Sequence, residues 1–166
     1  MKRFTAIIVL FLLAGCSASG ARFDESRFAT EPVPADKARL IFFRLEESPV
    51  GGPPARLEID GVRVGGLKNR GFLVVDAVPG EREVAADIWS DSGRFALKMN
   101  LEAQRTYYLR VSRREEHHKY MALPLLFGLA GGVVAASLSD GKGPFKIEPI
   151  EAAEATKLLP EFRLSE

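Results

Sequence analysis

Apolar and polar residues alternate in a series of short runs between residues 38 and 113. Leu57 and Ile59, for example, alternate with Glu58 and Asp60, as expected of a strand with one face in a core and one face in water. Asp60-Gly61 then supplies the positive-φ residues of a two-residue turn, so a partner strand should follow at once. The pattern predicts strands, several of them as hairpins in series, at residues 38–45, 55–59, 62–64, 72–77, 84–88, 94–101, 105–113 and 145–150.

The number of runs and the turn residues between them predict the fold class. About eight short strands separated by signals such as Pro79-Gly80 are typical of an antiparallel sandwich or an open barrel. We expect a mainly β domain over residues 38–150, a small antiparallel β-sandwich of about seven to eight strands. Residues 151–159 are rich in helix formers, with acids first and Lys157 near the end, so the C-terminal region 151–166 should begin with a short helix.

Composition agrees with one folded domain, and it argues against nucleic acid as a partner and against cysteine-based sites. The chain has 166 residues, of which 46% are apolar and 27% are charged, so it can form a real core. A net charge of +1 gives no long-range field that would attract nucleic acid. The single cysteine excludes an intrachain disulfide and a cysteine-rich metal site.

The N-terminus carries a targeting pattern. Lys2 and Arg3 precede an apolar run over residues 4–13, which has the length of a signal-peptide core and is too short to span a bilayer. Leu13-Ala14-Gly15-Cys16 follows directly and resembles the lipobox of bacterial lipoproteins, in which a branched apolar residue and two small residues precede the cysteine. The alternatives are an ordinary signal peptide with a chance cysteine, or a buried free cysteine.

The lipobox resemblance implies a processed protein with a lipid anchor. Residues 1–15 would be removed as a signal peptide, and Cys16 would accept a diacylglycerol and an amide-linked acyl chain such as palmitate, which is enough for stable anchoring. In such lipoproteins an Asp after the cysteine favours retention in the inner membrane. Ser17 therefore implies the periplasmic face of the outer membrane, with the inner membrane as the less favoured location.

The segment between anchor and domain, residues 16–37, is polar and interrupted by prolines. This composition predicts a flexible tether. Phe23 and Phe28 are its large apolar side chains, and we expect them to pack back on the domain rather than on a partner.

The turns and strands of residues 38–159 carry a second resemblance. They are similar to an uncharacterised family of small bacterial lipoprotein domains, which resemble the transthyretin-like sandwiches of carboxypeptidase regulatory domains and the surface-associated PEGA-type repeats. The family's matching pieces are structural, so the resemblance implies a sandwich and assigns no catalytic residue. The chain departs from the family in a long apolar insert before its last strand. The matching pieces are Asp60-Gly61, Gly65 to Leu67, Pro79-Gly80-Glu81 and Thr106-Tyr107-Tyr108.

That insert, residues 121–138 (MALPLLFGLAGGVVAASL), contains no charged residue. A helix of this length would be about 27 Å long, with its small residues on one face, as close-packed helices prefer. Three structures stay open: a helix or hairpin packed on the domain's own sheet, a segment that dips into the membrane or docks another envelope protein, and a spanning helix. Topology disfavours the last, because residues 145–150 would then lie across the membrane from their sheet. The residues expected to contact a membrane or partner are Leu125, Leu126, Phe127, Gly128, Gly131 and Gly132.

Few residues form a pattern suited to chemistry. His117-His118 beside Glu115-Glu116 has metal-ligand residue types, but adjacent residues of a strand face opposite ways and the chain has two histidines in all, so we expect a solvated loop and no metal. Because no nucleophile-and-base context or phosphate loop is recognisable, we expect neither an enzyme nor a cofactor. Asp87 and Asp91 flank Trp89, an arrangement compatible with a carbohydrate platform, although a tryptophan at the rim of a sandwich more often belongs to the edge of the core.

These patterns predict a lipid-anchored periplasmic domain that acts by binding. The leading interpretation is an interaction module at the outer membrane, with residues 121–138 in contact with the membrane or with an envelope protein. The alternative is a small-ligand or glycan binder that uses sandwich loops near Trp89.

Overall fold

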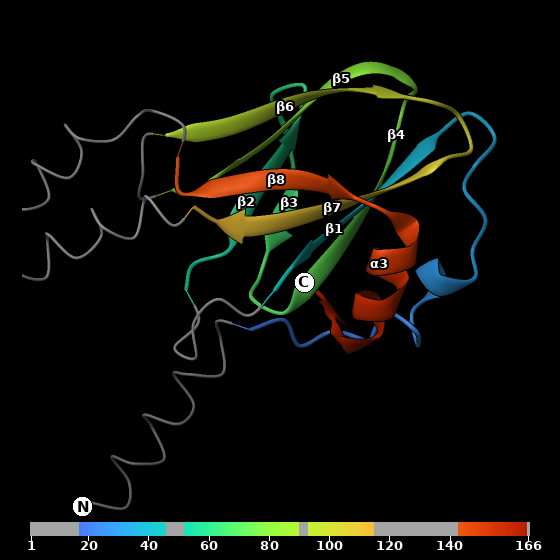
Figure 1. The fold of residues 1–166 in the computed structure, drawn as a ribbon, viewed down its shortest axis with the longest axis horizontal. Coiled ribbons are helices and arrows are strands. Elements are labelled where there is room, and N and C mark those ends of the chain that lie inside the picture. The colour runs from blue at the N-terminus through green and yellow to red at the C-terminus, as the bar shows by residue number, and fades with distance from the viewer. Residues whose placement is uncertain (1–16, 46–51, 90–92, 115–142, 166) are drawn as a thin grey trace, which may run out of the picture.

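The computed structural model describes residues 17–45, 52–89, 93–114 and 143–165. Over these residues two β-sheets pack face to face, and a short helix covers part of one of them (Figure 1). The larger sheet has the strand order β8-β7-β1-β4-β9, and the smaller has the order β3-β2-β5-β6. The strands are β1 (Ala38–Arg44), β2 (Ala55–Ile59), β3 (Val62–Leu67), β4 (Gly71–Ala77), β5 (Gly80–Asp87), β6 (Arg94–Leu101), β7 (Thr106–Arg113), β8 (Phe145–Ile150) and β9 (Arg163–Leu164).

The predicted mainly β sandwich is confirmed, but the prediction of hairpins in series is wrong where the chain changes sheets. β2 and β3 pair across the Asp60-Gly61 turn as expected. β4 instead joins β1, whereas β5 joins β2 and β6, so Pro79-Gly80 carries the chain from one sheet to the other. The pairings β1–β7 and β4–β9 are parallel, which strand alternation alone cannot reveal.

The main core lies between the two sheets. The inward side chains of β2 alternate with half-exposed ones, which is the burial that the sequence pattern predicts. Every residue of β1 is buried, because this strand is covered on both faces, and its sequence is accordingly an almost continuous apolar run. Fully buried members of the main core include Leu40, Phe42, Leu57, Leu67, Val84, Leu109, Val111 and Phe145.

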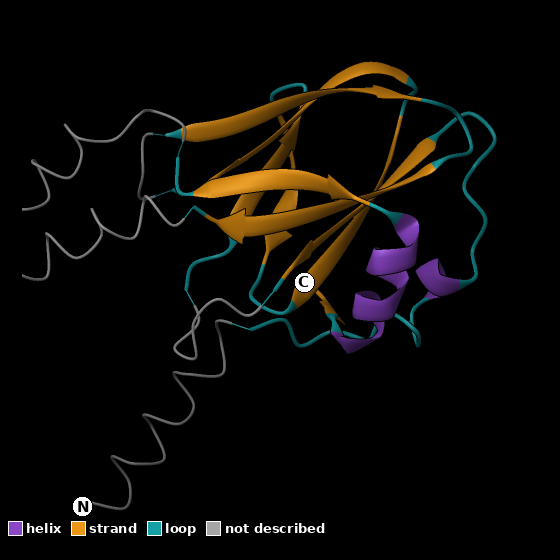
Figure 2. Ribbon diagram, in the orientation of Figure 1, coloured by secondary structure: helices purple, strands orange, loops and turns teal. Residues whose placement is uncertain are grey.

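A second core covers the outer face of the larger sheet. Its cover comes from the two termini of the described chain, namely residues 17–30 and the helix α3 (Ala152–Leu158) with the 3₁₀ turn η3 (Leu159–Glu161) (Figure 2). The expected C-terminal helix is thus present, and it contributes the buried side chain Ala155. Phe43 and Phe162 meet edge to face, with ring centroids 5.3 Å apart.

Residues 17–37 therefore do not form the free tether that their composition suggests. They pack on the domain: the ring of Phe23 meets that of Phe72 edge to face at 5.2 Å, and Phe28 packs against the same cluster. The backbone NH of Phe23 also donates to the carbonyl of Phe162 at 3.0 Å. The expectation that Phe23 and Phe28 pack back on the domain is confirmed, and their burial explains why this polar segment is held. The 3₁₀ turn η2 (Arg27–Ala29) lies within it.

Candidate functional site

The strand directions divide the connections of the sandwich between two ends. β1 and the parallel β7 finish together, β4 begins beside the end of β1, and β2 begins beside the ends of β3 and β5. We call this the Ser17 end, and its described residues are 17–19, 45, 52–54, 68–70, 88–89, 93, 114 and 143–144. The opposite end, called the turn end, contains residues 60–61, 78–79 and 102–105.

The first described residue is attached directly to the Ser17 end. Ser17 forms a parallel β-bridge with Asn69, and the backbone NH of Ala18 donates to the carbonyl of Asn69 at 3.0 Å. Gly71 makes this close approach possible, since a Cβ there would lie 3.0 Å from the Cβ of Ala18 and would meet the Ser165 side chain. Further along the chain, the NH of Gly20 donates to the carbonyl of Leu164 at 3.2 Å. The chain is therefore fixed from Ser17 onward.

Trp89 is the most exposed of the large apolar side chains at the described positions, at 78% exposure. It follows β5 at the Ser17 end, directly after the buried Ile88. The base of this strand end is held by Arg56, whose guanidinium donates to both carboxylate oxygens of Asp87 at 2.6 and 2.7 Å. These hydrogen bonds also raise the pKa of Arg56 above its usual value. The backbone under Trp89 is thus anchored, while its ring faces solvent.

The face of the smaller sheet between the two ends is charged and internally paired. Arg94 donates to Glu83 at 2.8 Å and to Glu58 at 3.3 Å, and these bonds raise the pKa of Arg94, with Glu83 the larger cause. Lys98 lies 3.8 Å from Glu81 on the same face. The exposed Lys98–Glu81 pair contributes little stability, and the Arg94 pairs are partly buried, so the charges of this face are satisfied within it. The candidate binding surfaces therefore lie at the two ends.

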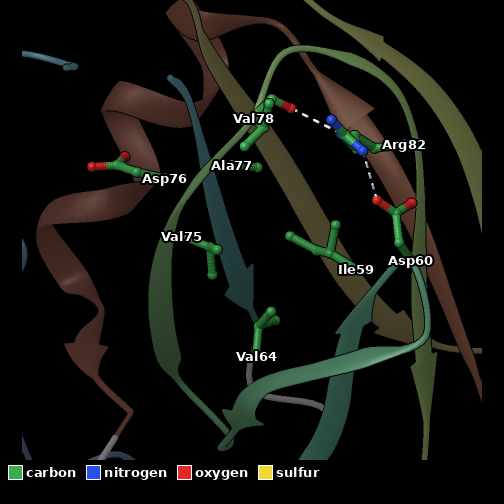
Figure 3. A pocket seen from close by; sticks show the side chains of 8 residues that line it. All are labelled: Ile59, Asp60, Val64, Val75, Asp76, Ala77, Val78 and Arg82. Carbon is green, nitrogen blue, oxygen red and sulfur yellow. Dashed lines mark hydrogen bonds and ion pairs between the residues drawn. The ribbon is translucent and has the colours of Figure 1, made fainter. Parts of the chain in front are cut away.

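A pocket of about 290 Å³ lies at the turn end, between β3 and β4 (Figure 3). Its apolar lining includes Ile59, Val64 and Val75, whose side chains point into the hollow in Figure 3. At its rim, Arg82 donates to Asp60 at 3.1 Å and to the carbonyl of Val78 at 2.9 Å. The charged residues of the lining are therefore paired, Arg82 with Asp60 and Asp76 with Arg39. A second pocket, of about 320 Å³, is lined at the Ser17 end by Leu45, Arg70, Glu161 and Phe162.

We predict that Asp60 makes folding stability sensitive to acid. Its carboxylate accepts from the backbone NH of Glu83 at 2.9 Å and from Arg82, and these bonds lower the pKa of Asp60 below its usual 3.8, with the Glu83 bond the larger cause. Because the native state favours the charged form, the stabilisation is present above pH 3.8 and is lost as the pH falls through the lower folded pKa. Asp60→Asn should weaken this loss, and Asn tolerates the φ of 50° found there.

Urea unfolding at a series of pH values checks this prediction. Glu148 serves as an internal reference because its pKa is also lowered, chiefly by the hydrogen bond from Lys146, and the substitution leaves it in place. Wild type and Asp60→Asn should therefore both lose stability in acid, wild type more steeply. Parallel curves for the two proteins would show that the Asp60 contacts contribute nothing in solution.

The described residues of the two ends present surfaces that a ligand or a partner could contact. Among them no cluster of three or more His, Cys, Asp or Glu side chains could hold a metal ion. The two described carboxyl groups with shifted pKa values, Asp60 and Glu148, are shifted downward and paired with cations. A carboxyl group that acts as a general acid or base near neutral pH needs the opposite shift. The arrangement thus supplies an exposed indole and two pockets.

The structure places only part of the residues singled out from the sequence. Trp89 lies at the Ser17 end, with Asp87 beside it engaged by Arg56. The turn-end pocket was not anticipated, because it depends on β3 and β4 lying in different sheets. The alternation of apolar residues along the strands can predict the apolar lining of this pocket, but it cannot predict that the two sheets leave a hollow there. Outside the described residues lie Cys16, the insert 121–138 with Leu125, Leu126, Phe127, Gly128, Gly131 and Gly132, and the pair His117-His118 with its flanking acids, as well as Asp91.

Two findings bear on membrane attachment and on family. Within residues 17–45, 52–89, 93–114 and 143–165, no helix is long and apolar enough to cross a membrane. Comparison with protein-family models finds no match to the chain, and comparison with curated proteins finds none either.

Proposed function

We propose that the protein is a lipid-anchored binding domain of the bacterial envelope, attached through Cys16 and acting by contact rather than by catalysis. The lipobox at residues 13–16 supports the anchor. The structural observation that carries the proposal is the attachment of Ser17 to Asn69. A lipid on the preceding residue would hold the folded domain at the membrane surface itself, not at the end of a long linker. The periplasmic face of the outer membrane is the proposed location.

The apolar insert is proposed to add a second contact, with the membrane or with an envelope protein. The insert belongs to residues 115–142, between the described Arg114 and Gly143, and the NH of Arg114 donates to the carbonyl of Pro144 at 2.9 Å. Arg114 and Gly143 therefore lie at the Ser17 end, from which the proposed anchor would extend. A contact made by residues 121–138 would act on the same side of the domain as the lipid.

A small-ligand or glycan site near Trp89 is the second candidate function. The observation in its favour is the 78% exposure of Trp89 on a strand end fixed by the Arg56–Asp87 pair. Exposed indole rings can stack on apolar faces of ligands, while nearby polar groups orient them.

Substitution of Cys16 tests the proposed anchor. In cells of a lipoprotein-processing bacterium, Cys16→Ala should abolish acylation and lower the share of the protein in the membrane fraction, because the thiol is the expected lipid acceptor. Mass spectrometry of the wild-type N-terminal peptide should show the acyl chains on Cys16. Ser19→Ala is the matched control and should stay at the membrane. Wild-type protein whose Cys16 carries no acyl chain would contradict the anchor. Processed Cys16→Ala protein that stays at the membrane would instead point to the contact of the insert, which flotation tests separately.

Liposome flotation tests the proposed contact of the insert. Mature Cys16→Ala protein has no lipid, so flotation would report a second membrane contact, and deletion of residues 121–138 should abolish it. If the unlipidated protein stays in solution but an envelope protein copurifies only when the insert is present, the contact is with that partner. If the unlipidated protein does not float and no envelope protein copurifies with it, the insert has no place in the proposed function.

A further inference from the structure

We infer that the domain stands on the membrane with its Ser17 end toward the lipid, so that Trp89 lies in the headgroup region of the leaflet that holds the anchor. This inference rests on the proposed lipidation of Cys16 and deepens it by assigning an orientation and a contact residue.

The first argument is the length of chain between lipid and domain. Adjacent Cα atoms are about 3.8 Å apart, so Cys16 lies no farther than that from the attached Ser17. A cysteine whose acyl chains enter the hydrocarbon core lies at the level of the headgroups. The chain cannot be drawn out between the two, because Ala18, Gly20 and Phe23 are each bonded to the domain through their backbone NH groups. The connection between β3 and β4, which contains Asn69, must therefore lie close to the lipid surface.

The second argument is the position of Trp89. Ser17 bridges Asn69 in the connection that leads from β3 into β4, and the next residue, Ala18, lies close to Gly71 at the start of β4 in the larger sheet. Trp89 lies two residues after the end of β5, which belongs to the smaller sheet. The two residues thus mark opposite layers of the sandwich at one end, and together they define a face rather than a single point. Tryptophan is enriched at membrane interfaces because its ring is apolar and its NH can stay hydrogen-bonded to water or headgroups. The ring of Trp89 is 78% exposed at this end, so it is free to enter the headgroup region of the membrane.

Charge does not account for such a contact. The charged side chains in the described connections of the Ser17 end, Lys68, Arg70 and Arg114, are basic, and Glu161 of the pocket there is acidic. The sequence of the same connections also contains an excess of acids, which offsets them: Glu46, Glu47, Asp91, Glu115, Glu116 and Asp140, against Lys119 and Lys142. We therefore assign the contact to the indole ring and expect it to persist at high salt, which screens surface charge.

Trp89 is the single tryptophan of the chain, so its own fluorescence is the test. The lipidated full-length protein is incorporated into phosphatidylethanolamine–phosphatidylglycerol vesicles in which part of the lipid carries bromine on the upper acyl carbons. Trp89 emission should shift to shorter wavelength and be quenched in these vesicles. The matched control is Trp89→Phe/Ala103→Trp, which keeps the anchor and moves the reporter to an exposed position of the turn end. Its quenching should be several-fold weaker.

The outcomes separate this inference from the proposed function. Protein that carries the lipid and floats with the vesicles, yet shows equal or no quenching at the two positions, overturns the orientation and leaves the anchor intact. Protein that carries no lipid and does not float overturns both. If soluble peptidoglycan fragments, but not brominated lipid, alter Trp89 emission, the indole serves a glycan and the membrane contact is overturned.

Discussion

Replacing Phe72 with alanine is expected to lower the free energy of unfolding by about 3–5 kcal/mol, the usual cost of removing a buried aromatic ring. Phe72 is fully buried in the second core, where β4 meets both termini of the described chain. Its ring contacts Phe23, and the adjacent backbone is paired with β9 through Leu164. Loss of the ring therefore loosens the N-terminal segment and the C-terminal segment together. Urea or guanidinium unfolding of the purified domain measures the change.

The same substitution tests whether residues 17–30 belong to the fold. Phe23→Ala should cost less than Phe72→Ala, because Phe23 is only partly buried. The double mutant should show a coupling of about 0.5–1.5 kcal/mol, the range found for edge-to-face rings beyond their area of burial. Val62→Ala is the matched control: this side chain is 67% exposed, and its loss should change stability by less than about 0.5 kcal/mol. A Phe23→Ala protein as stable as wild type would mean that the segment is detached in solution.

The strands of the sandwich could be predicted from the sequence because burial follows the pleat. In β2, for instance, Leu57 and Ile59 point inward, and the residues between them are polar and half-exposed. The alternation of apolar and polar residues in the sequence predicts this arrangement. Which strands pair is a different matter. The two-residue turn at Asp60-Gly61 forces a hairpin, but the turn at Pro79-Gly80 is equally compatible with a change of sheet, and that is what occurs. Sequence spacing does not distinguish the two cases.

The attachment of the N-terminal segment shows where composition misleads. Residues 17–37 have the polar and proline content of a linker, yet a few apolar side chains suffice to hold them, because each finds a place on one sheet face. The short strand β9 was missed for a related reason. It pairs over only two residues, Arg163 and Leu164, so no alternation can develop. Tertiary contacts between the two chain ends decide both features, and they are not local in sequence.

In the candidate site too, some features can be predicted from local sequence and others require the topology. Exposure of Trp89 could not be derived from its neighbours, because a tryptophan after a strand is equally compatible with a core edge. Its location at the end that holds Ser17 follows from the strand directions, which require the topology. The lipobox-like sequence at residues 13–16, by contrast, is a local pattern that a peptidase and a lipid transferase would recognise in an extended chain. It can be recognised without any fold, and it stays a prediction for the experiments on Cys16.

One buried ion pair joins the sheet to the N-terminal segment. Arg39 of β1 lies directly opposite Asp76 of β4, and its guanidinium donates to the two carboxylate oxygens at 2.8 and 2.9 Å. The remaining terminal nitrogen donates to the carbonyl of Glu31 at 2.6 Å. These partners raise the pKa of Arg39, chiefly through the hydrogen bond to Asp76. The side chain of Arg39 is 3% exposed, so it depends on these partners in place of water.

Asp76→Ala should therefore destabilise the domain by about 3 kcal/mol, at the lower limit for a buried pair because Asp76 itself is 28% exposed. The loss comes from leaving a buried cation without its carboxylate rather than from losing attraction alone. Removing both charges in Arg39→Met/Asp76→Leu should consequently restore part of the stability. Asp36→Ala is the matched control, because this carboxylate is 79% exposed and its loss should change stability by less than about 0.5 kcal/mol. Chemical unfolding measures the stability of these variants. A double variant less stable than Asp76→Ala would contradict this explanation, because the loss would then come from the missing ion pair and not from leaving Arg39 buried without a carboxylate.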